Sequence, residues 1–406
     1  MGAARFSAVR RPALPREEGR QEARFRLKGD TGLLVATFLL IAIGIAMVFS
    51  TSYPLAETSR SSDGFYLLKR QLAYAVVALL MLAVGYRLST RVLRKGARAI
   101  FAVSVLLLIA VKLLGREVNG AQAWFSLGPV NFQPSEFAKL ALVLGLAAYF
   151  APRPAGARSW RELRGPVLML ALTAGLIAIE PDMGTAAVVF LSALVFLNIC
   201  GVPFRRVVAL AGVALLLAGA MVVREPYQLQ RLRDWADPAG TASRGSYQTV
   251  RSLVALGSGG LFGLGYCQGR EKYFYLPAAT TDSILAVVGE ELGLIGTWAV
   301  LGLLGWVVWR GFAISRAQPD RFAGLLASGI ACLIGVQALT NIAVVTGCIP
   351  TTGVPLPFVS FGGSSLAFTA LGVGILLHLS RRRERAARVG MRRAGAGTAT
   401  LGLGVR

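Results

Sequence analysis

Three carboxylates lie within ten residues at the start of a long apolar run: Asp282, Glu290 and Glu291. An ionisable group at membrane depth is costly and by default marks a functional site. Asp282 stands at the mouth of the run. A carboxylate there suits a general base for proton transfer and equally suits a helix N-cap, and one residue can fill both roles.

The spacing of these acids limits what they can share. If a helix begins at Asp282, Glu290 lies about 12 Å deeper and about 80° round the helix, whereas Glu291 lies about 180° round. Gly289 lies beneath Asp282 on the same face and leaves room there. We therefore expect Asp282 to face a cavity. We expect Glu290 and Glu291 to pair with a buried cation or with helix-end groups, as supporting acids.

The stretch QPSEFAKL at 133–140 carries a second pair of charges. Pro134 is typical of a first helical position, and Glu136 suits the first turn. Glu136 and Lys139 are three residues apart and share a helix face. Lys139 is the one lysine well inside an apolar run. Either the two residues form an internal ion pair that fixes helix packing, or Lys139 is a cation aimed at an anionic substrate group.

Glu180 and Asp182 straddle Pro181 at a tight turn between two apolar runs. Asp182 suits an N-cap of the following helix, which is the simpler interpretation. Alternatively, both acids help to hold a divalent cation such as Mg or Mn. Nothing in the sequence requires a cofactor, and no set of metal ligands is apparent.

Basic residues also occur near the face that carries these turns. They are candidates for binding anionic lipid head groups or a diphosphate. The alternative is a solvated loop face. The residues are Arg70, Arg231, Arg233, Arg244, Arg251, Arg270 and Lys272.

Composition indicates a membrane protein. The chain has 406 residues, of which 55% are hydrophobic and only 16% are charged, against about a quarter charged in soluble proteins. The net charge of +23 does not indicate nucleic acid, because the basic residues sit in short loops between apolar runs. The four cysteines show no spacing typical of a metal site or of disulfides, and His378 is expected at a membrane interface.

The apolar runs predict an all-α integral membrane protein with ten transmembrane helices, both termini cytoplasmic and one long extracellular loop. The expected domains are a basic, disordered tail at 1–30, a membrane domain at 31–380 containing the long loop 224–280, and a second tail at 381–406. The expected spans are 33–51, 71–88, 98–114, 135–151, 165–180, 183–200, 205–223, 281–309, 322–347 and 361–380.

Three irregular loops gather on the predicted outer face. Loop 115–134 has turn signals around Trp124 and Phe125. Loop 224–280 contains an amphipathic patch from Thr249 to Leu256, so we expect it to be ordered on the membrane surface. Loop 348–362 holds three prolines at membrane depth, where non-helical backbone must be buried in protein or line a cavity.

Six motifs resemble the SEDS family (shape, elongation, division, sporulation), which includes FtsW, RodA and SpoVE. The similarity runs from Leu33 to Leu379, and the KYFYLP and PTTGVPLPF stretches are closest to FtsW and SpoVE. The motifs are YLLKRQLAY at 66–74, WFSLGPVNFQPSEFAKL at 124–140, EPDMGTA at 180–186, GSYQTVRSLVALGSGGLFGLG at 245–265, YLP…TD…GEELGLIG at 275–296 and TGCIPTTGVPLPFVSFGGSSL at 346–366.

The resemblance implies an inverting peptidoglycan glycosyltransferase in the bacterial plasma membrane, at the division septum. Such an enzyme transfers glycan from a lipid II donor to the 4-hydroxyl of a lipid II acceptor on the outer face and releases undecaprenyl diphosphate. The expected partners are a class B penicillin-binding protein transpeptidase and other division proteins.

The family's catalytic acid matches Asp282, and Gln248 and Ser364, which lie in the motifs, are expected to contact substrate with Glu136, Lys139 and the basic residues. Most members have Glu-Ala-His-Thr-Asp after Leu-Pro, whereas this chain has Ala278 and Thr280 in place of the Glu and the His.

Two other functions are open: a lipid II flippase, and a non-catalytic scaffold for the transpeptidase. A flippase should place polar groups along a path through both leaflets. Glu290 and Glu291 are the only residues whose depth in an apolar run favours such a path. A scaffold alone would not need carboxylates at the mouths of spans. The sequence therefore favours the polymerase.

Overall fold

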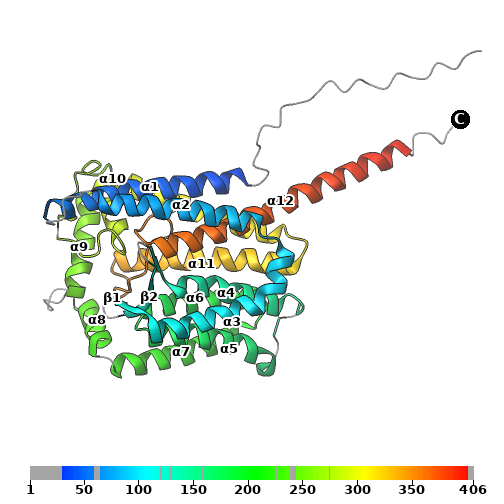
Figure 1. Cartoon of the computed structure of the whole chain (residues 1–406), viewed down its shortest axis with the longest axis horizontal. Helices are drawn as coiled ribbons and strands as arrows, with labels where there is room; N and C mark the ends of the chain where they lie inside the picture. Colours follow the sequence, from blue (N-terminus) through cyan, green and yellow to red (C-terminus); the bar gives the residue numbers. More distant parts are fainter. Residues whose placement is uncertain are drawn as a thin grey trace, which may run out of the picture.

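The computed structural model describes residues 30–58, 65–118, 121–127, 130–154, 156–157, 159–224, 226–237, 244–273 and 275–400. Long helices run side by side in this part of the chain (Figure 1). They are α1 (Thr31–Thr58), α2 (Tyr66–Arg87), α3 (Thr90–Leu114), α4 (Pro134–Phe150), α5 (Trp160–Ile179), α6 (Met183–Ile199), α7 (Phe204–Arg224), α10 (Ile284–Arg316), α11 (Arg321–Val345) and α12 (Gly363–Thr400).

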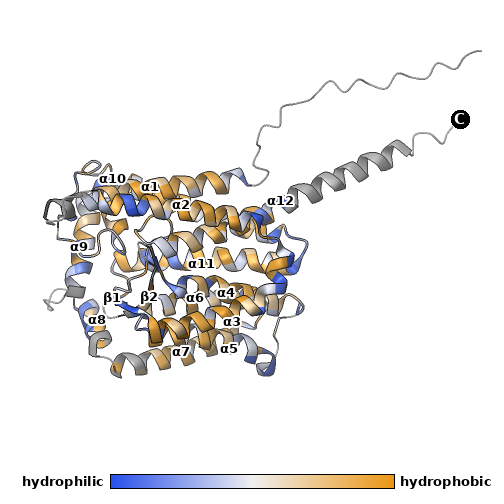
Figure 2. Ribbon diagram, in the orientation of Figure 1, coloured by the Kyte–Doolittle hydropathy of each residue, from blue (hydrophilic) through white to orange (hydrophobic). Residues whose placement is uncertain are grey.

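Each long helix overlaps a span expected from the sequence. Within the described residues, seven segments are long and apolar enough to cross a membrane, and α6 is a shorter apolar helix. Orange, hydrophobic residues cover the middle of the bundle in Figure 2. The protein is therefore a helical, multi-pass membrane protein. The total of ten spans and the side of each terminus stay predictions, since α4 and α6 have only 17 residues each.

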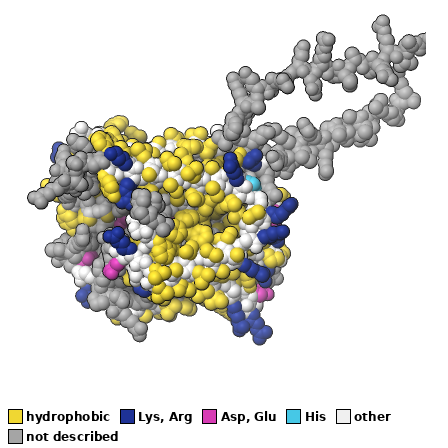
Figure 3. Space-filling view, viewed as in Figure 1, with side chains coloured by type: hydrophobic (Ala, Val, Ile, Leu, Met, Phe, Trp, Pro, Cys, Tyr) yellow, Lys and Arg dark blue, Asp and Glu magenta, His cyan; other side chains and the backbone are white. Residues whose placement is uncertain are grey.

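Turns from distant parts of the chain meet at one end of the bundle, which we call the basic end. There the Asp30 backbone N–H donates to Ser380, Arg310 pairs with Asp30, and Arg321 donates to the carbonyl of Arg153. Figure 3 shows dark blue Lys and Arg side chains along the end where α12 leaves the bundle. The candidate site residues lie at the opposite end, which we call the loop end.

Two further helices lie in the predicted long loop, α8 (Pro226–Ala236) and α9 (Arg244–Ser258). They cross the loop end of the bundle in Figure 1. In α9, Ser246, Thr249 and Ser252 are buried, whereas Leu253 and Val254 are exposed. These two helices give part of the loop regular structure, and the expected place on the membrane surface stays a prediction. An apolar face turned outward is what a helix at a membrane surface needs.

The all-α expectation is wrong in loop 115–134. Three short strands form an antiparallel sheet of order β1-β2-β3: β1 (Arg116–Val118), β2 (Ala121–Leu127) and β3 (Val130–Phe132). Trp124 pairs with Arg116, and Phe125 pairs with Phe132. The turn signals seen in the sequence separate these strands, and the three-residue strands β1 and β3 are too short for an alternating pattern to be apparent.

The helix expected at 281–309 begins three residues later and is broken. Gly293 has φ +67° and ψ −166° inside α10, a conformation open mainly to glycine. The segment 259–265 lies against this break. The Leu264 N–H donates to the carbonyl of Glu290, and the Leu294 N–H donates to that of Gly260. Backbone groups released by the break are thus satisfied within the protein, as they must be at membrane depth.

The helix α12 continues to Thr400. The disorder expected for the tail at 381–406 stays a prediction. Residues 401–406, and the N-terminal tail apart from Asp30, lie outside the described residues.

Candidate active site

Asp282 lies in a tight turn that precedes α10. The turn closes through the backbone N–H of Ser283, which donates to the carbonyl of Ala278 at 3.2 Å. Ala278 has φ +53°. The N-cap of α10 is Ser283, so the N-cap alternative for Asp282 is wrong. The carboxylate of Asp282 is therefore free of a capping role.

The backbone of this turn is held by its surroundings. The Phe361 N–H donates to the Thr280 carbonyl at 2.9 Å. The Ser360 hydroxyl donates to the Thr281 carbonyl at 2.6 Å, and the Asn341 side chain donates to the Asp282 carbonyl at 2.8 Å. The three successive carbonyls thus fix the turn against α11 and the loop that precedes α12.

Gln248 of α9 joins the turn from a third side. Its Nε2 donates to Ser283 Oγ at 3.0 Å. We expected Gln248 to contact substrate, and the structure gives its amide a partner next to Asp282 instead. Gln248 therefore helps to hold the Asp282 turn, and its contact with substrate stays a prediction.

The surroundings of Asp282 favour a proton acceptor. Burial raises the pKa of its carboxyl, and the neighbouring Asp182 raises it further, whereas a Thr281 hydrogen bond and the Arg231 guanidinium act in the opposite direction. The side chain is only partly buried, so it remains open to a substrate. Arg231 of α8 also donates to the Thr351 carbonyl at 3.1 Å.

The EPDMGTA turn lies close to this carboxylate. Asp182 caps α6, because its Oδ1 accepts from the Thr185 N–H at 3.0 Å, and its Oδ2 accepts from Gln133 at 3.1 Å. The capping interpretation is confirmed. Burial, with a smaller effect of Asp182, raises the pKa of Glu180 to about 8. The Glu180 carboxylate is fully buried and has no hydrogen-bond partner among the described residues.

A divalent cation at this turn stays a prediction. No group of three or more His, Cys, Asp or Glu residues that could hold a metal occurs among the residues the structure describes. Glu180 and Asp182 also differ in their surroundings, since Asp182 is committed to the α6 cap.

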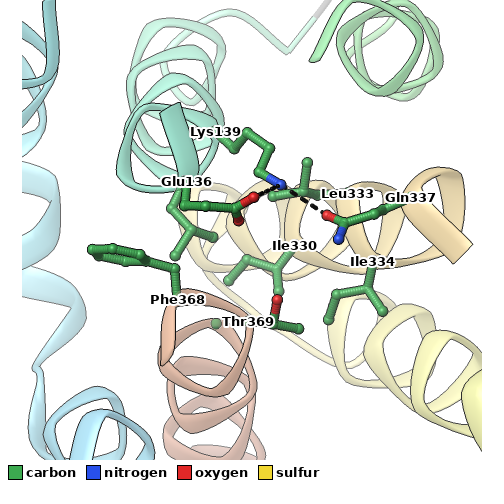
Figure 4. Close-up of a pocket in the computed structure, with 10 residues that line it drawn as sticks. Glu136, Lys139, Ile330, Leu333, Ile334, Gln337, Phe368 and Thr369 are labelled. Atoms are coloured by element: carbon green, nitrogen blue, oxygen red, sulfur yellow. Dashed lines mark hydrogen bonds and ion pairs between the residues drawn. The ribbon is translucent and has the colours of Figure 1, made fainter. Parts of the chain in front are cut away.

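Glu136 and Lys139 form the internal ion pair that was one of the two alternatives. Lys139 Nζ lies 2.8 Å from Glu136 Oε1 and 2.8 Å from Gln337 Oε1, as Figure 4 shows. Gln337 in turn donates to the Pro355 carbonyl at 3.0 Å. Lys139 is 4% exposed. The pair therefore connects α4 and α11 to the loop beneath the site, and contact of Lys139 with substrate stays a prediction.

Glu290 and Glu291 anchor the segment 259–272. Glu290 Oε1 accepts from the backbone N–H groups of Arg270 at 2.7 Å and Glu271 at 3.2 Å. Glu291 Oε1 lies 2.7 Å from Lys272 Nζ and accepts from Ser50 at 2.6 Å. Glu291 thus pairs with a buried cation as expected, whereas Glu290 binds backbone N–H groups of a non-helical segment.

The same network bears on three details of the sequence prediction. Asp282 precedes α10, so the positions expected for Glu290 and Glu291 round the helix relative to Asp282 do not apply. Both glutamates face the segment 259–272. Gly289 leaves no cavity beneath Asp282, because it packs against Leu256 and Gly259. Lys272 was expected to contact substrate, but its ammonium is buried in the pair with Glu291.

The remaining candidates have varied environments. Arg70 donates to the Tyr74 hydroxyl at 2.6 Å, and the Tyr74 ring packs on Phe361 beside the Asp282 turn. Ser364 is buried and joins β3 to α12, accepting from the Gln133 N–H and donating to the Asn131 carbonyl.

Of the basic residues in the long loop, Arg270 and Arg233 are exposed, and Arg251 pairs with Glu271 at 2.9 Å. The side chain of Arg244 lies outside the described residues.

Sequence reasoning missed the polar residues of α11. Gln337 and Asn341 are buried and four residues apart, so they share one face. Asn341 donates to the Val354 carbonyl at 2.8 Å in addition to that of Asp282. Two amides on one face of an apolar helix are a signal that could have identified them.

A family model described as a cell cycle protein of the FtsW, RodA and SpoVE type matches residues 31–385. Stage V sporulation protein E of Bacillus subtilis is 36% identical over 359 residues, covering 87% of this chain and 97% of that protein. A probable peptidoglycan glycosyltransferase FtsW of Halomonas elongata is 38% identical over 370 residues, covering 88% and 93%.

Solved structures are also similar to this chain over most of its length. A chain from a peptidoglycan synthase complex, described in terms of polymerization and crosslinking, is 34% identical with a TM-score of 0.72, covering 87% of this chain and 98% of that chain. The rod shape determining protein RodA of Thermus thermophilus is 32% identical with a TM-score of 0.64, covering 87% and 97%.

Proposed function

The chain belongs to the FtsW, RodA and SpoVE family of SEDS proteins, and from that premise we propose that it is a peptidoglycan glycosyltransferase that polymerises lipid II. The observation that carries the proposal is the Asp282 turn. It presents a partly buried carboxylate of raised pKa at the loop end, and its backbone is held by three separate hydrogen bonds.

The loop end faces the outside of the plasma membrane in this proposal. The bias of Lys and Arg toward the basic end supports a cytoplasmic position for that end and for both termini. Ten spans then connect the two faces, and α8 and α9 lie at the outer leaflet. Lipid II reaches the site from that leaflet, with its polyprenyl chain against apolar helix faces.

Asp282 serves as the general base. Its carboxylate takes the proton of the acceptor 4-hydroxyl as that oxygen attacks the anomeric carbon of the donor. The new glycosidic bond forms while the bond to the diphosphate breaks, and the diphosphate leaves with the bonding electron pair. One displacement at an α-linked donor yields a β-linked product by inversion.

The departing diphosphate needs positive charge nearby. Arg231 is the best candidate because its guanidinium influences Asp282 directly and its side chain lies at the loop that carries Thr351. Arg70, beside Phe361 through Tyr74, is a second candidate. A preorganised cation stabilises charge that develops in the transition state, and so raises the rate.

The internal pairing of Glu290 and Glu291 favours the polymerase over the flippase. Those acids were the main sequence feature in favour of a transport path, and both are engaged by groups of the protein itself. A class B penicillin-binding protein is the proposed partner, since one solved neighbour belongs to a complex described in terms of polymerization and crosslinking. We also propose a septal role, which the similarity to FtsW proteins supports.

The test is glycan-strand synthesis from purified lipid II with the partner transpeptidase present. Asp282→Asn removes the proton acceptor and keeps the size of the side chain, so it should abolish polymer while leaving expression and folding unchanged. Asp320→Asn, at the basic end, is the control and should polymerise like the wild type. Equal polymer from wild type and Asp282→Asn would refute the base assignment. Absence of polymer from both, with labelled lipid II still crossing the bilayer, would favour the flippase.

A further inference from the structure

A cavity of about 470 Å³ opens at the basic end of the bundle, between α3, α4 and α5. Four cations line it: Arg94, Lys95 and Arg98 from α3, and Arg153 from the turn after α4. The remaining lining is apolar or aromatic, and no carboxylate occurs among the described residues that line it. The cavity therefore combines a positive mouth with an apolar interior, and it lies far from the Asp282 turn.

Small residues on α4 create this hollow. Gly145 and Ala148 face Phe101 of α3 and Met169 of α5. A Cβ added at Gly145 would lie 3.5 Å from the Met169 sulfur and 3.7 Å from the Phe101 ring. Since protein interiors are otherwise closely packed, a space of this size between helices is a candidate binding site.

The cations around the mouth are weakly neutralised. Arg94 lies 3.9 Å from Asp320, but both side chains are about half exposed, so this pair contributes little. Arg153 stacks on the Tyr149 ring at 4.0 Å. Lys95 and Arg98 have no ion-pair partner in the part of the chain that the structure describes. Like charges gathered round one opening create a potential that attracts an anion.

The apolar side chains on the two sides of the cavity indicate which chemical group is attached to that anion. Phe101 on α3 and Met169 on α5 line the cavity from either side of α4. Both belong to helices long and apolar enough to span a membrane. A ligand at the mouth therefore has apolar surface on two sides, which suits a head group whose hydrocarbon chains run along α3 and α5.

We propose that this cavity binds the phosphate head group of an anionic glycerophospholipid from the cytoplasmic leaflet. Arginine and lysine clusters between transmembrane helices on this side are suited to acidic head groups. A polyprenyl phosphate offers the same phosphate chemistry. The glycerophospholipid is favoured because its two acyl chains match the two apolar flanks.

The experiment measures lipid retention by the full-length protein in detergent by native mass spectrometry. Phosphatidylglycerol, cardiolipin, phosphatidylcholine and undecaprenyl phosphate are titrated separately. The variant is Lys95→Gln with Arg98→Gln, and the control is Arg91→Gln, an exposed cation of the same helix that does not line the cavity. Each lost charge should weaken binding about fivefold, so the double variant should bind phosphatidylglycerol roughly 25-fold more weakly.

A second variant, Ala148→Leu, fills the cavity without changing any charge. It should also reduce binding of phosphatidylglycerol and cardiolipin, and it covers the case in which the charge variant fails to fold. Unchanged binding in both variants, equal retention of phosphatidylcholine, or retention of undecaprenyl phosphate alone would overturn the proposal. The readout is independent of lipid II polymerisation.

Discussion

Replacing Lys272 by Met tests whether its ion pair holds the segment that leads to Asp282. The ammonium lies 2.7 Å from Glu291 Oε1 and 2.8 Å from Ser50 Oγ, and both side chains of the pair are at most 1% exposed. Lys272→Met leaves a buried carboxylate that keeps two donors, the Ser50 hydroxyl at 2.6 Å and the Cys267 N–H at 3.0 Å.

The expected loss follows from this geometry. Removing one partner of a buried ion pair typically destabilises a protein by about 3–5 kcal/mol. Because the Glu291 carboxylate keeps two donors, we expect Lys272→Met to lose about 3 kcal/mol of stability, at the lower end of this range. The double variant with Glu291→Gln has no buried charge left, so we expect a loss of only about 1–2 kcal/mol. The two substitutions should therefore be strongly non-additive.

Unfolding by denaturant in detergent micelles measures these free energies, and polymerisation of lipid II by the same samples reports on Asp282. Asp320→Asn is the control, because its partner Arg94 is 3.9 Å away and both side chains are about half exposed. That change should cost less than about 1 kcal/mol. A loss below about 1 kcal/mol for Lys272→Met, or additive single variants, would refute the reasoning.

Three further predictions concern proton binding and backbone conformation. Because burial raises the pKa of Asp282, the initial polymerisation rate should fall on acidification at a higher pH than an ordinary aspartate, of pKa about 3.9, would give. An acid limb centred on that ordinary value would contradict the base assignment. The pKa of Glu180, raised by burial to about 8, means that ionisation destabilises the fold as pH rises from about 4.5 through 8. Glu180→Gln should therefore resist unfolding better than the wild type at pH 9, by up to about 5 kcal/mol, and equal stability of the two at pH 9 would contradict this. Gly293→Ala should cost at least about 2 kcal/mol, because its φ of +67° is strained for alanine and the added Cβ would lie 2.3 Å from the Gly263 nitrogen. Gly305→Ala, in open space on the same helix, should be neutral or stabilising when both variants are unfolded in detergent.

Local patterns predicted much of this protein. The positions of the long helices follow from continuous apolar runs, and the Asp182 cap and the Glu136–Lys139 pair follow from spacing within one turn. Loop 348–362 is non-helical as its prolines predict. In each case the interacting groups are close in sequence, so their geometry depends little on the rest of the fold.

Local patterns could not predict contacts between residues that lie far apart in the sequence. The angles drawn from Asp282 along α10 assumed one continuous helix, whereas the helix begins at Ile284 and breaks at Gly293. Glu291 finds its donors on α1 and on the segment 259–272. No local pattern reveals that Ser50 of α1 lies beside Glu291, because 241 residues separate them.

The way in which the Asp282 turn is held shows how it can keep its shape with unusual side chains. Its bonds to Phe361, Ser360 and Asn341 are all accepted by backbone carbonyls, at residues 280, 281 and 282. A backbone carbonyl is present whatever residue stands there. The side chains of Ala278 and Thr280, which replace the Glu and His of the resembling sequences, contribute none of these bonds. The turn can therefore keep its shape after those replacements, while the Asp282 carboxylate, which none of these three bonds uses, remains available to a substrate.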